Sequence, residues 1–407
     1  MKSIFRKIIC ILLLSSSAFS DDYHYRNILV GEQASGLGGA YVAIADDPSG
    51  IYYNPAGIVF GMENYFSLSA NAYMQSSRKY QSVIAGQDYN YTSSNLVPTF
   101  FGLTQSRGRD KWGFAVVVPN QDSYNQNDQI TINSTGPTEA SSFKRKYFDQ
   151  DQTYMIGVAY AKELWKETTG GLSLMGVYRT RNAIDNQLIR YNDNNYFVQE
   201  ANIDQTTAGL YVKYGMQYMP IPKFSFGATI AKTFTVSSTR KNRTTVIDSK
   251  AATNPTEGNP VTSPKLLSPL EVALGMAYFP SKSVLYSADF FYFTEDKDHT
   301  DFTAKATWNV AFGTERYLSD SLVMRLGFFT NNANTAPVSS SLTNQLDHVD
   351  LYGLTAAVAI RSPGSSVTLG TTFSSGTGQG QAIGNNTRVN TIVEQRSAFY
   401  LVGSYQL

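Results

Sequence analysis

The segment GEQASGLGGAYVAIADDPSGIYYNPAGI, from Gly31 to Ile58, decides how the rest of this 407-residue chain is interpreted. It is rich in small residues and in the turn-forming residues Gly, Pro, Asn and Asp. It lies between an apolar N-terminal run and a long series of alternating polar and apolar residues. Two interpretations follow: a folded plug for whatever the alternating segments build, or a capped helix that opens a secreted domain.

The first 20 residues have the pattern of a secretory signal peptide. Basic residues precede an apolar core at residues 8–14, and Ala18-Phe19-Ser20 is a small-x-small cleavage site. The core is too short to span a bilayer as a helix, and no other apolar run reaches about 20 residues. The only cysteine, Cys10, lies in this core, so we expect a mature chain without disulfides, cysteine-zinc sites or cysteine nucleophiles.

Composition favours amphipathic strands. Aromatic residues make up 13% of the chain, yet the mean hydropathy is only −0.24. Strands with one apolar face and one polar face combine a high aromatic content with a low mean hydropathy. With a net charge of +1, the chain lacks the excess of basic residues that is typical of nucleic-acid-binding proteins.

Most of the chain after residue 62 alternates with period two, as half-buried strands do. In one example, Leu172, Leu174 and Tyr178 form an apolar row opposite Ser173 and Arg179. About fourteen such segments are present. Short connections (near 106–110, 162–170, 219–222, 280–282, 317–321 and 361–365) alternate with long polar stretches (near 75–95, 120–146, 182–204, 236–268, 295–304, 331–347 and 376–390).

This alternation of connection lengths is typical of periplasmic turns and extracellular loops. It predicts an all-β membrane protein, an antiparallel outer-membrane barrel of about 14 strands. A secreted β-sandwich or solenoid is the alternative, but it gives no reason for the alternation, and the chain shows no internal repeat.

The opening segment itself has helix-like spacing of apolar residues between Gly31 and Asp47. Asp46 and Asp47 precede Pro48, which suits an N-cap followed by proline at the first helical position. We expect a short helix from Pro48 to about Tyr53. Pro55 should end it and hold Asn54 in an extended conformation.

Two short motifs in this segment carry a resemblance: Ala45-Asp46-Asp47 and Asn54-Pro55-Ala56. With the small residues before them, they resemble the hatch of the FadL family of outer-membrane transporters for hydrophobic compounds. The resemblance implies a fourteen-stranded barrel whose lumen is plugged by a small helical N-terminal hatch. The expected divisions are a signal peptide at 1–20, a hatch at 21–61 and a transmembrane barrel at 62–407.

The resemblance implies passive uptake of compounds such as long-chain fatty acids through a hatch-gated barrel, with lateral exit through the wall. The partners would be a hydrophobic small molecule and the lipid and lipopolysaccharide of the bacterial outer membrane. Gate candidates are Asn54, Pro55 and Ala56, with Asp46 and Asp47 beside them. Pro55 would fix the turn while Asn54 hydrogen-bonds strand backbone.

A carboxylate ligand would need a cation in the lumen. Residues with the right strand parity are Arg179, Arg181, Lys213 and Arg325. The alternative is that these cations pair with Glu271, Asp289 and Glu315, because polar barrel interiors are normal. Aromatic residues that either line an apolar site or face lipid are Phe100, Phe101, Tyr211, Phe291 and Phe293.

Other functions remain as alternatives. Related barrels such as PorV-type secretion components begin with a similar segment, so a secretion partner or a structural porin-type barrel is the second hypothesis. A hydrolase is the third and weakest. The three histidines, His24, His299 and His348, have no metal-binding partner at strand or helix spacing. We therefore expect neither an enzyme nor a cofactor or metal site.

Overall fold

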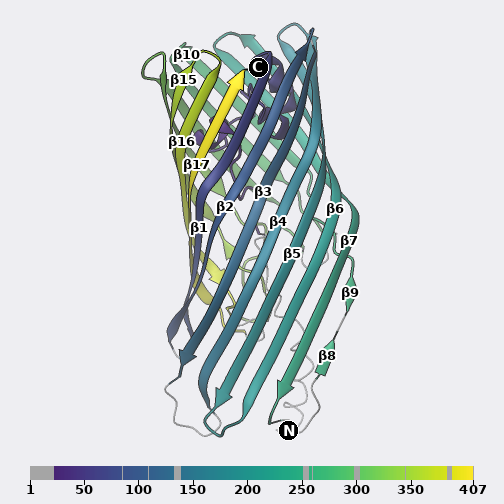
Figure 1. Ribbon diagram of the computed structural model, residues 1–407, viewed down its shortest axis with the longest axis vertical. Coiled ribbons are helices and arrows are strands. Elements are labelled where there is room, and N and C mark those ends of the chain that lie inside the picture. Colours follow the sequence, from purple (N-terminus) through teal and green to yellow (C-terminus); the bar gives the residue numbers. More distant parts are fainter. Residues whose placement is uncertain are drawn as a thin grey trace.

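A computed structural model describes residues 23–84, 86–108, 110–132, 139–250, 256–258, 260–297, 303–343, 345–382 and 387–406. The expected signal peptide and His299 lie outside these ranges. The described chain forms a closed antiparallel barrel of 14 strands (Figure 1), which confirms the expected fold class.

The barrel strands are all antiparallel to their neighbours. In chain order they are β1 (Asn64–Ile84), β2 (Gln87–Arg107), β3 (Asp110–Thr131), β4 (Ala140–Trp165), β5 (Thr168–Tyr191), β6 (Tyr196–Ile221), β7 (Phe224–Asp248), β10 (Glu271–Ser281), β11 (Val284–Phe293), β12 (Thr307–Tyr317), β13 (Leu322–Asn331), β15 (Leu351–Ser362), β16 (Ser365–Gly380) and β17 (Asn390–Gln406). Short fragments β8 (Thr256–Gly258) and β9 (Val261–Thr262) pair with β7, and β14 (His348–Val349) pairs with β16.

The last strand closes the barrel on the first. β17 pairs with β1 from Tyr65↔Gln406 to Tyr80↔Ile392, so the sheet has no terminal edge strand. Closure is what a membrane-spanning sheet needs, because hydrocarbon offers no partner for an edge N–H or C=O group. No helix in the described ranges has the length and apolar character required for a membrane span.

The outer face carries the apolar rows expected from the sequence. Large side chains such as Trp112, Leu174, Phe312 and Leu369 are 42–63% exposed on that face, while Ser173 and Asn309 are fully buried in the interior. Of the five aromatic residues with ambiguous parity, Phe101 lies outside, in ring contact with Phe66 and Phe114. The inward-facing members are Phe100, Tyr211, Phe291 and Phe293.

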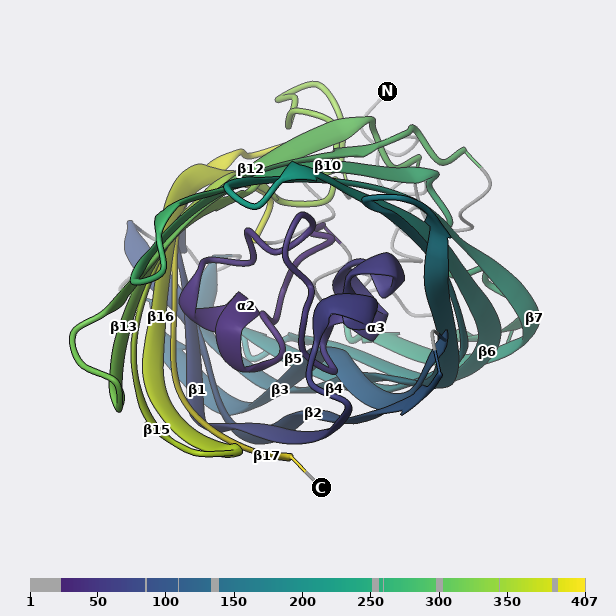
Figure 2. The ribbon, with the colours of Figure 1, turned by 90° about the horizontal axis from the view of Figure 1, so that it is seen from above.

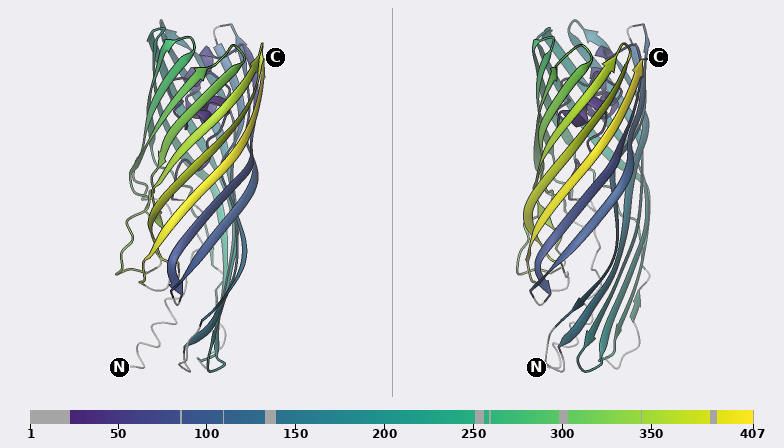
Figure 3. Two further views of the ribbon diagram at one scale, coloured as in Figure 1. Left: turned by 90° about the vertical axis from the view of Figure 1, so that its left-hand side faces the viewer. Right: turned by 60° about the vertical axis from the view of Figure 1, so that its left-hand side comes forward.

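Several stretches expected to be extracellular loops are strands instead. Residues 75–95 and 182–204 are almost entirely parts of β1, β2, β5 and β6, joined by tight turns. Backbone pairing continues beyond the apolar band because a polar strand loses nothing by facing water on both sides. As a result β3–β7 form a wall that extends well beyond β10–β13 (Figure 3).

The N-terminal segment lies inside the barrel, surrounded by the strands (Figure 2). It contains α2 (Glu32–Gly36), α3 (Gly50–Tyr53) and the 3₁₀-helix η1 (Pro55–Phe60). We call residues 23–61 the hatch. Within the stretch of helix-like spacing from Gly31 to Asp47, only α2 is helical, and the chain is irregular from Leu37 to Ser49. Gly38 and Gly39 have φ of 66° and 79°, a backbone conformation that ends α2.

Candidate functional site

The Asn54-Pro55-Ala56 turn is docked on strands β5 and β6. Asn54 is extended (φ −152°, ψ 102°), as expected for a residue before proline. Its Nδ2 donates to the carbonyl of Val42 (2.7 Å) within the hatch and to that of Met216 (3.1 Å) on β6. Its Oδ1 accepts from the amide of Ala56 (3.1 Å). The side chain therefore joins two hatch segments to the wall.

Polar side chains of the wall complete this contact. Thr169 Oγ1 donates to the carbonyl of Ala56 (3.0 Å), and Ser173 Oγ donates to that of Ile51 (2.7 Å). Gln217 Nε2 donates to the carbonyl of Ala43 (2.9 Å). The hatch carbonyls that a short helix leaves unpaired are thus satisfied by β5 and β6.

A belt of inward-facing glycines makes room for the hatch. At each of them, a side-chain carbon would meet a hatch atom at less than 3 Å. At Gly171 it would lie 2.5 Å from the carbonyl carbon of Pro55, and at Gly215 it would overlap Asn54 Oδ1. The other members are Gly113 on β3, Gly227 on β7, Gly275 on β10, Gly313 on β12 and Gly327 on β13. The wall is shaped to the hatch backbone.

The opposite side of the hatch is held by Glu32, which the sequence did not single out. Its carboxylate accepts from Ser366 Oγ (2.6 Å), Thr368 Oγ1 (2.8 Å) and Ser404 Oγ (2.7 Å) on β16 and β17. Arg325 Nη1 lies 3.4 Å from it. Burial alone would raise the pKa of Glu32, but Arg325 and the three hydroxyl donors hold that pKa below its ordinary value.

Asp46 and Asp47 have different partners. Asp47 Oδ1 accepts from the amide of Ser49 (2.7 Å) and caps the turn before α3, although Ser49 rather than Asp47 occupies the N-cap position. Burial raises the pKa of Asp47 to about 7, against the lowering effect of Ser49. Asp46 accepts from Tyr41 Oη (2.9 Å) and does not cap the helix.

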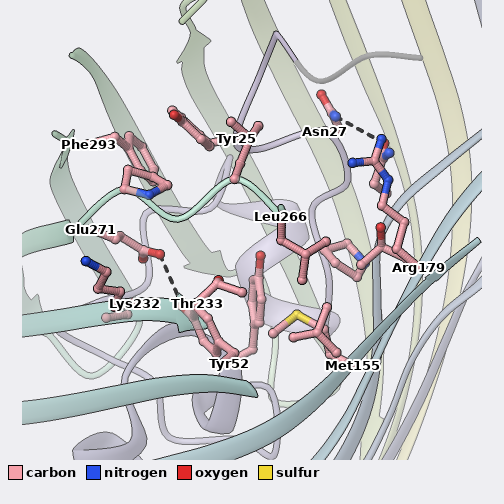
Figure 4. A pocket seen from close by; sticks show the side chains of 18 of the residues that line it. Tyr25, Asn27, Tyr52, Met155, Arg179, Lys232, Thr233, Leu266, Glu271 and Phe293 are labelled. Atoms are coloured by element: carbon pink, nitrogen blue, oxygen red, sulfur yellow. Dashed lines mark hydrogen bonds between the residues drawn. The ribbon is translucent and has the colours of Figure 1, made fainter. Parts of the chain in front are cut away.

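A pocket of about 180 Å³ lies in the lumen beside the hatch (Figure 4). Tyr25 of the hatch stacks on Phe293 of β11 with ring centroids 4.3 Å apart. The lining is completed by Tyr52 of α3 and by strand and loop residues that include Met155, Val177, Tyr211 and Leu266. The pocket is mixed in character: aromatic and aliphatic side chains lie beside polar and charged groups such as Arg179, Lys232 and Glu271.

The four candidate cations are buried and each has a carboxylate partner. Arg179 pairs with Asp151 and Arg181 with Asp149, both on β4. Lys213 Nζ lies 2.8 Å from Glu271, and Arg325 Nε lies 2.6 Å from Glu315. Asp289 was expected to pair with one of these cations. Its carboxylate instead accepts hydrogen bonds from the hatch amides of Tyr41 and Val42.

These cations do not converge on one site. Of the four, Arg179 lines the pocket, while Arg325 packs against Gly36 of the hatch. A ligand role for them stays a prediction. His24 Nε2 lies 2.8 Å from the Val349 carbonyl, and His348 Nδ1 lies 3.1 Å from Thr335 Oγ1. The described residues contain no group of three or more His, Cys, Asp or Glu side chains that could hold a metal ion.

The wall beside the pocket has a break in its hydrogen-bond ladder. The β2–β3 ladder runs from Arg107↔Asp110 to Phe100↔Val117, and beyond it the two strands share a single further pair, Ser93↔Tyr124. Residues 94–99 and 118–123, all described, have no cross-strand pairs with one another. Pro98 and Pro119 lie in the break, and proline cannot donate to a ladder. The β3–β4 ladder is irregular between Val117 and Asn120 as well.

Solved structures with a similar fold cover nearly the whole chain. A Pseudomonas aeruginosa FadL homologue is 13% identical, with a TM-score of 0.65 over 94% of this chain and 99% of that one. The P. putida toluene transporter TodX is 14% identical, with a TM-score of 0.67 over 93% and 98% of the two chains. The Ralstonia pickettii toluene transporter TbuX is 13% identical, with a TM-score of 0.62 over 94% and 99%.

No protein-family model matches the chain, and no curated protein sequence does. At these identities the likeness establishes the fold. The resemblance to FadL-type barrels that the hatch motifs carry is therefore confirmed in the architecture of the whole chain.

Proposed function

We propose that this protein takes up small hydrophobic compounds across the bacterial outer membrane. The apolar outer face and the closed barrel suit a strand-spanned membrane. The names of the similar structures, a FadL homologue and toluene transporters, point in the same direction. The observation that carries the proposal is the aromatic pocket that lies between a seated hatch and a break in the wall.

The size of the pocket favours a one-ring compound over a long-chain fatty acid. An apolar cavity of about 150 Å³ in another protein is large enough for benzene, and this pocket measures about 180 Å³. Drug-sized ligands generally occupy sites of about 300–1,000 Å³. A sixteen-carbon chain would need a larger space than the pocket offers.

The buried cation of the pocket, Arg179, favours a neutral ligand. It makes a two-point contact with Asp151, while the second cation of the lining, Lys232, is exposed and lies over the ring of Phe234. An ionised carboxylate placed beside Arg179 would have to compete with that buried partner, and breaking a buried ion pair costs about 3–5 kcal/mol. A neutral aromatic compound leaves the pair intact.

The break between β2 and β3 supports lateral exit. Two cavities of the lumen border the unpaired stretch of β3: the aromatic pocket reaches Pro119 and Asn120, and a smaller one reaches Gln121 and Asp122. On β2, Leu96 is 69% exposed on the outer face beside the break. A solute in the pocket thus has a short path to the membrane without unseating the hatch.

An uptake assay tests the proposal. Cells without other hydrocarbon channels would receive the wild-type barrel or a Val177→Trp variant, which fills the pocket. The matched control is Val158→Trp, on the lipid-facing side of β4, where Val158 is 50% exposed. We expect labelled toluene uptake with wild type and control, at least fivefold lower uptake with Val177→Trp, and little palmitate uptake with any of them. Equal uptake with an empty vector would contradict transport.

A secretion partner or a structural barrel remains the second candidate. The wall formed by the distal parts of β3–β7 favours it, since this polar surface projects away from the apolar band (Figure 3). Such a role would leave toluene uptake at the empty-vector level. Shortening the wall would then impair secretion or the structural role instead.

A further inference from the structure

A second interruption of the barrel wall lies between β7 and β10. β10 pairs with β7 only from Tyr278↔Phe224 to Glu271↔Ala231. Beyond it, the partners of β7 on this side are the fragments β9, at Arg240 and Lys241, and β8, from Thr244 to Val246. Between Ala231 and Arg240, β7 therefore has no strand partner on this side within the described chain.

Residues 263–270, which we call the strap, cover this gap without forming a strand. The strap has the sequence SPKLLSPL, and its prolines Pro264 and Pro269 cannot donate to a ladder. Side chains replace the ladder. The amide of Leu266 donates to Thr235 Oγ1 (2.9 Å), and Ser268 Oγ donates to the Thr233 carbonyl.

The other end of the strap is tied to residues that directly follow β11. The amide of Ser268 donates to Asp296 Oδ2 (2.7 Å), and the amide of Leu270 donates to Thr294 Oγ1 (2.9 Å). A backbone bond from the Thr294 amide to the Leu270 carbonyl (3.0 Å) also holds this end. The bonds at Leu266 and Ser268 each involve one side chain and can break one at a time, whereas the bonds of a continuous ladder form and break together.

Leu266 closes the gap from within. Its side chain is 6% exposed and reaches into the aromatic pocket, between the side formed by Tyr25 and Phe293 and the side formed by Met155 and Arg179 (Figure 4). Gly209 on β6 leaves room for it, since a side-chain carbon there would lie 2.7 Å from Leu266 Cδ1.

The surroundings of the gap suit a hydrophobic solute. The β7–β10–β11–β12 sheet ends at a row with Tyr292 and Trp308 exposed on the outer face, which is typical of the membrane interface. Next to the gap on β7, Phe234 is 49% and Val236 74% exposed. These apolar side chains lie where a solute would leave the interface.

Elsewhere in the lumen, tyrosine rings surround a buried ion pair of β4 and β5. Arg145 lies over the rings of Tyr89, Tyr91 and Tyr147, 5.0–5.7 Å from their centroids, and binds Asp185 through two N–H groups. Tyr80 and Tyr124 pack against Tyr91 in the same cluster. A solute that passed through this cluster would have to displace the Arg145–Asp185 ion pair.

We propose that hydrophobic solutes reach the pocket through the gap between β7 and the strap by displacing Leu266. This inference rests on the proposed transport function and adds the route of access. The strap is the outer closure of the pocket, and the β2–β3 break is its exit. The side chain at position 266 then sets the size limit for the solute.

A single cysteine tests the strap. Leu266→Cys is made in a Cys10→Ala background, so that position 266 carries the only thiol. The control is Val261→Cys on β9, which directly precedes the strap, where Val261 is 66% exposed. Cells are treated with a bulky maleimide, modification is read by mass spectrometry, and toluene uptake is measured before and after.

We expect both thiols to be modified. Modification of Leu266→Cys should lower uptake at least fivefold, while modified Val261→Cys should transport like the wild type. Adding Thr235→Val and Ser268→Ala, which remove two ties of the strap, should speed the modification of Leu266→Cys severalfold. Leu266→Ala should raise uptake of solutes larger than toluene.

Two results would overturn the inference. In one, Leu266→Cys stays unmodified while the cells transport toluene. In the other, it is fully modified and uptake does not change. Both results leave the transport function standing, because uptake by the wild type is measured in the same experiment. Absence of wild-type uptake would instead reject the transport function on which the strap depends.

Discussion

Pro98 on β2 and Pro119 on β3 face one another in the register that their strands share. The ladder pairs Phe100 with Val117 on one side of them and Ser93 with Tyr124 on the other, without a shift. The two strands therefore keep the same register across the interruption. Near the end of it that borders Phe100 and Val117, neither facing residue can donate, since both are prolines.

Replacing both prolines with valine should close the opening. Pro98→Val with Pro119→Val supplies two N–H donors at facing positions, so we expect slower hydrogen exchange of the amides at 94–99 and 118–123. Toluene uptake should fall at least fivefold. The control is Pro222→Ala in the β6–β7 turn, remote from this ladder. A protected ladder with unchanged uptake would show that solutes leave by another route.

Asn54 is expected to hold the hatch rather than to trigger it. Asn54→Ala removes the bonds to Val42, Met216 and Ala56 and leaves buried backbone groups unpaired. We expect hatch docking to weaken by about 2 kcal/mol, seen as faster hydrogen exchange at residues 54–60. Unchanged exchange would mean that the glycine belt alone seats the turn.

The glycine belt can be tested at one position. Gly215→Ala places a carbon atom against Asn54 Oδ1 and should displace the turn. Gly176→Ala on β5 is the control, because its new carbon would lie 3.7 Å from the Ile156 carbonyl oxygen, an ordinary van der Waals contact. Limited proteolysis should cut the hatch of Gly215→Ala and spare that of Gly176→Ala. Equal protection of both would contradict a tight fit.

Glu32 anchors the other side of the hatch. Glu32→Gln keeps the size of the side chain but removes the charge that faces Arg325 and three hydroxyl groups. We expect α2 to loosen by about 1–3 kcal/mol, read from hydrogen exchange at residues 32–39. As a control, Glu295→Gln in the exposed pair with Lys305 should leave hatch exchange unchanged.

Asp47 should make hatch docking depend on pH. Burial raises the pKa of Asp47 to about 7, above its unfolded value of 3.8. The docked hatch therefore binds the proton more tightly, so docking is strongest at acidic pH and weakens as pH rises from about 4 through 7. Exchange protection of residues 47–53, corrected for intrinsic rates, should fall between pH 5 and pH 8. Asp47→Asn should abolish most of that change.

Much of the fold follows from local sequence. Alternation fixes which residues face lipid, and Pro55 fixes the extended Asn54, because both effects act over a few residues. Some long polar stretches, such as 75–95 and 182–204, are strands rather than loops, and a strand in water has no apolar row to reveal it. The helix-like spacing between Gly31 and Asp47 corresponds only to the short α2, because the wall sets the shape of the hatch.

The site is less predictable than the barrel. The partners of Glu32 lie more than 290 residues away, at Arg325, Ser366, Thr368 and Ser404. No local pattern reports contacts that depend on barrel closure. The prolines of the two wall interruptions were visible signals, because proline in a strand marks an edge or a gap. Whether such a proline marks a gap depends on how its strand pairs with the neighbouring strand, and the sequence does not show that pairing.

The central claim is that a solute leaves the pocket sideways, over a hatch that stays seated. A photoreactive toluene analogue, activated during uptake in cells, tests this directly when the cross-linked peptides are mapped by mass spectrometry. We predict cross-links to the pocket and to residues 94–99 of β2 and 118–123 of β3. Cross-links concentrated on the periplasmic side of the hatch, with none at the β2–β3 break, would contradict the account.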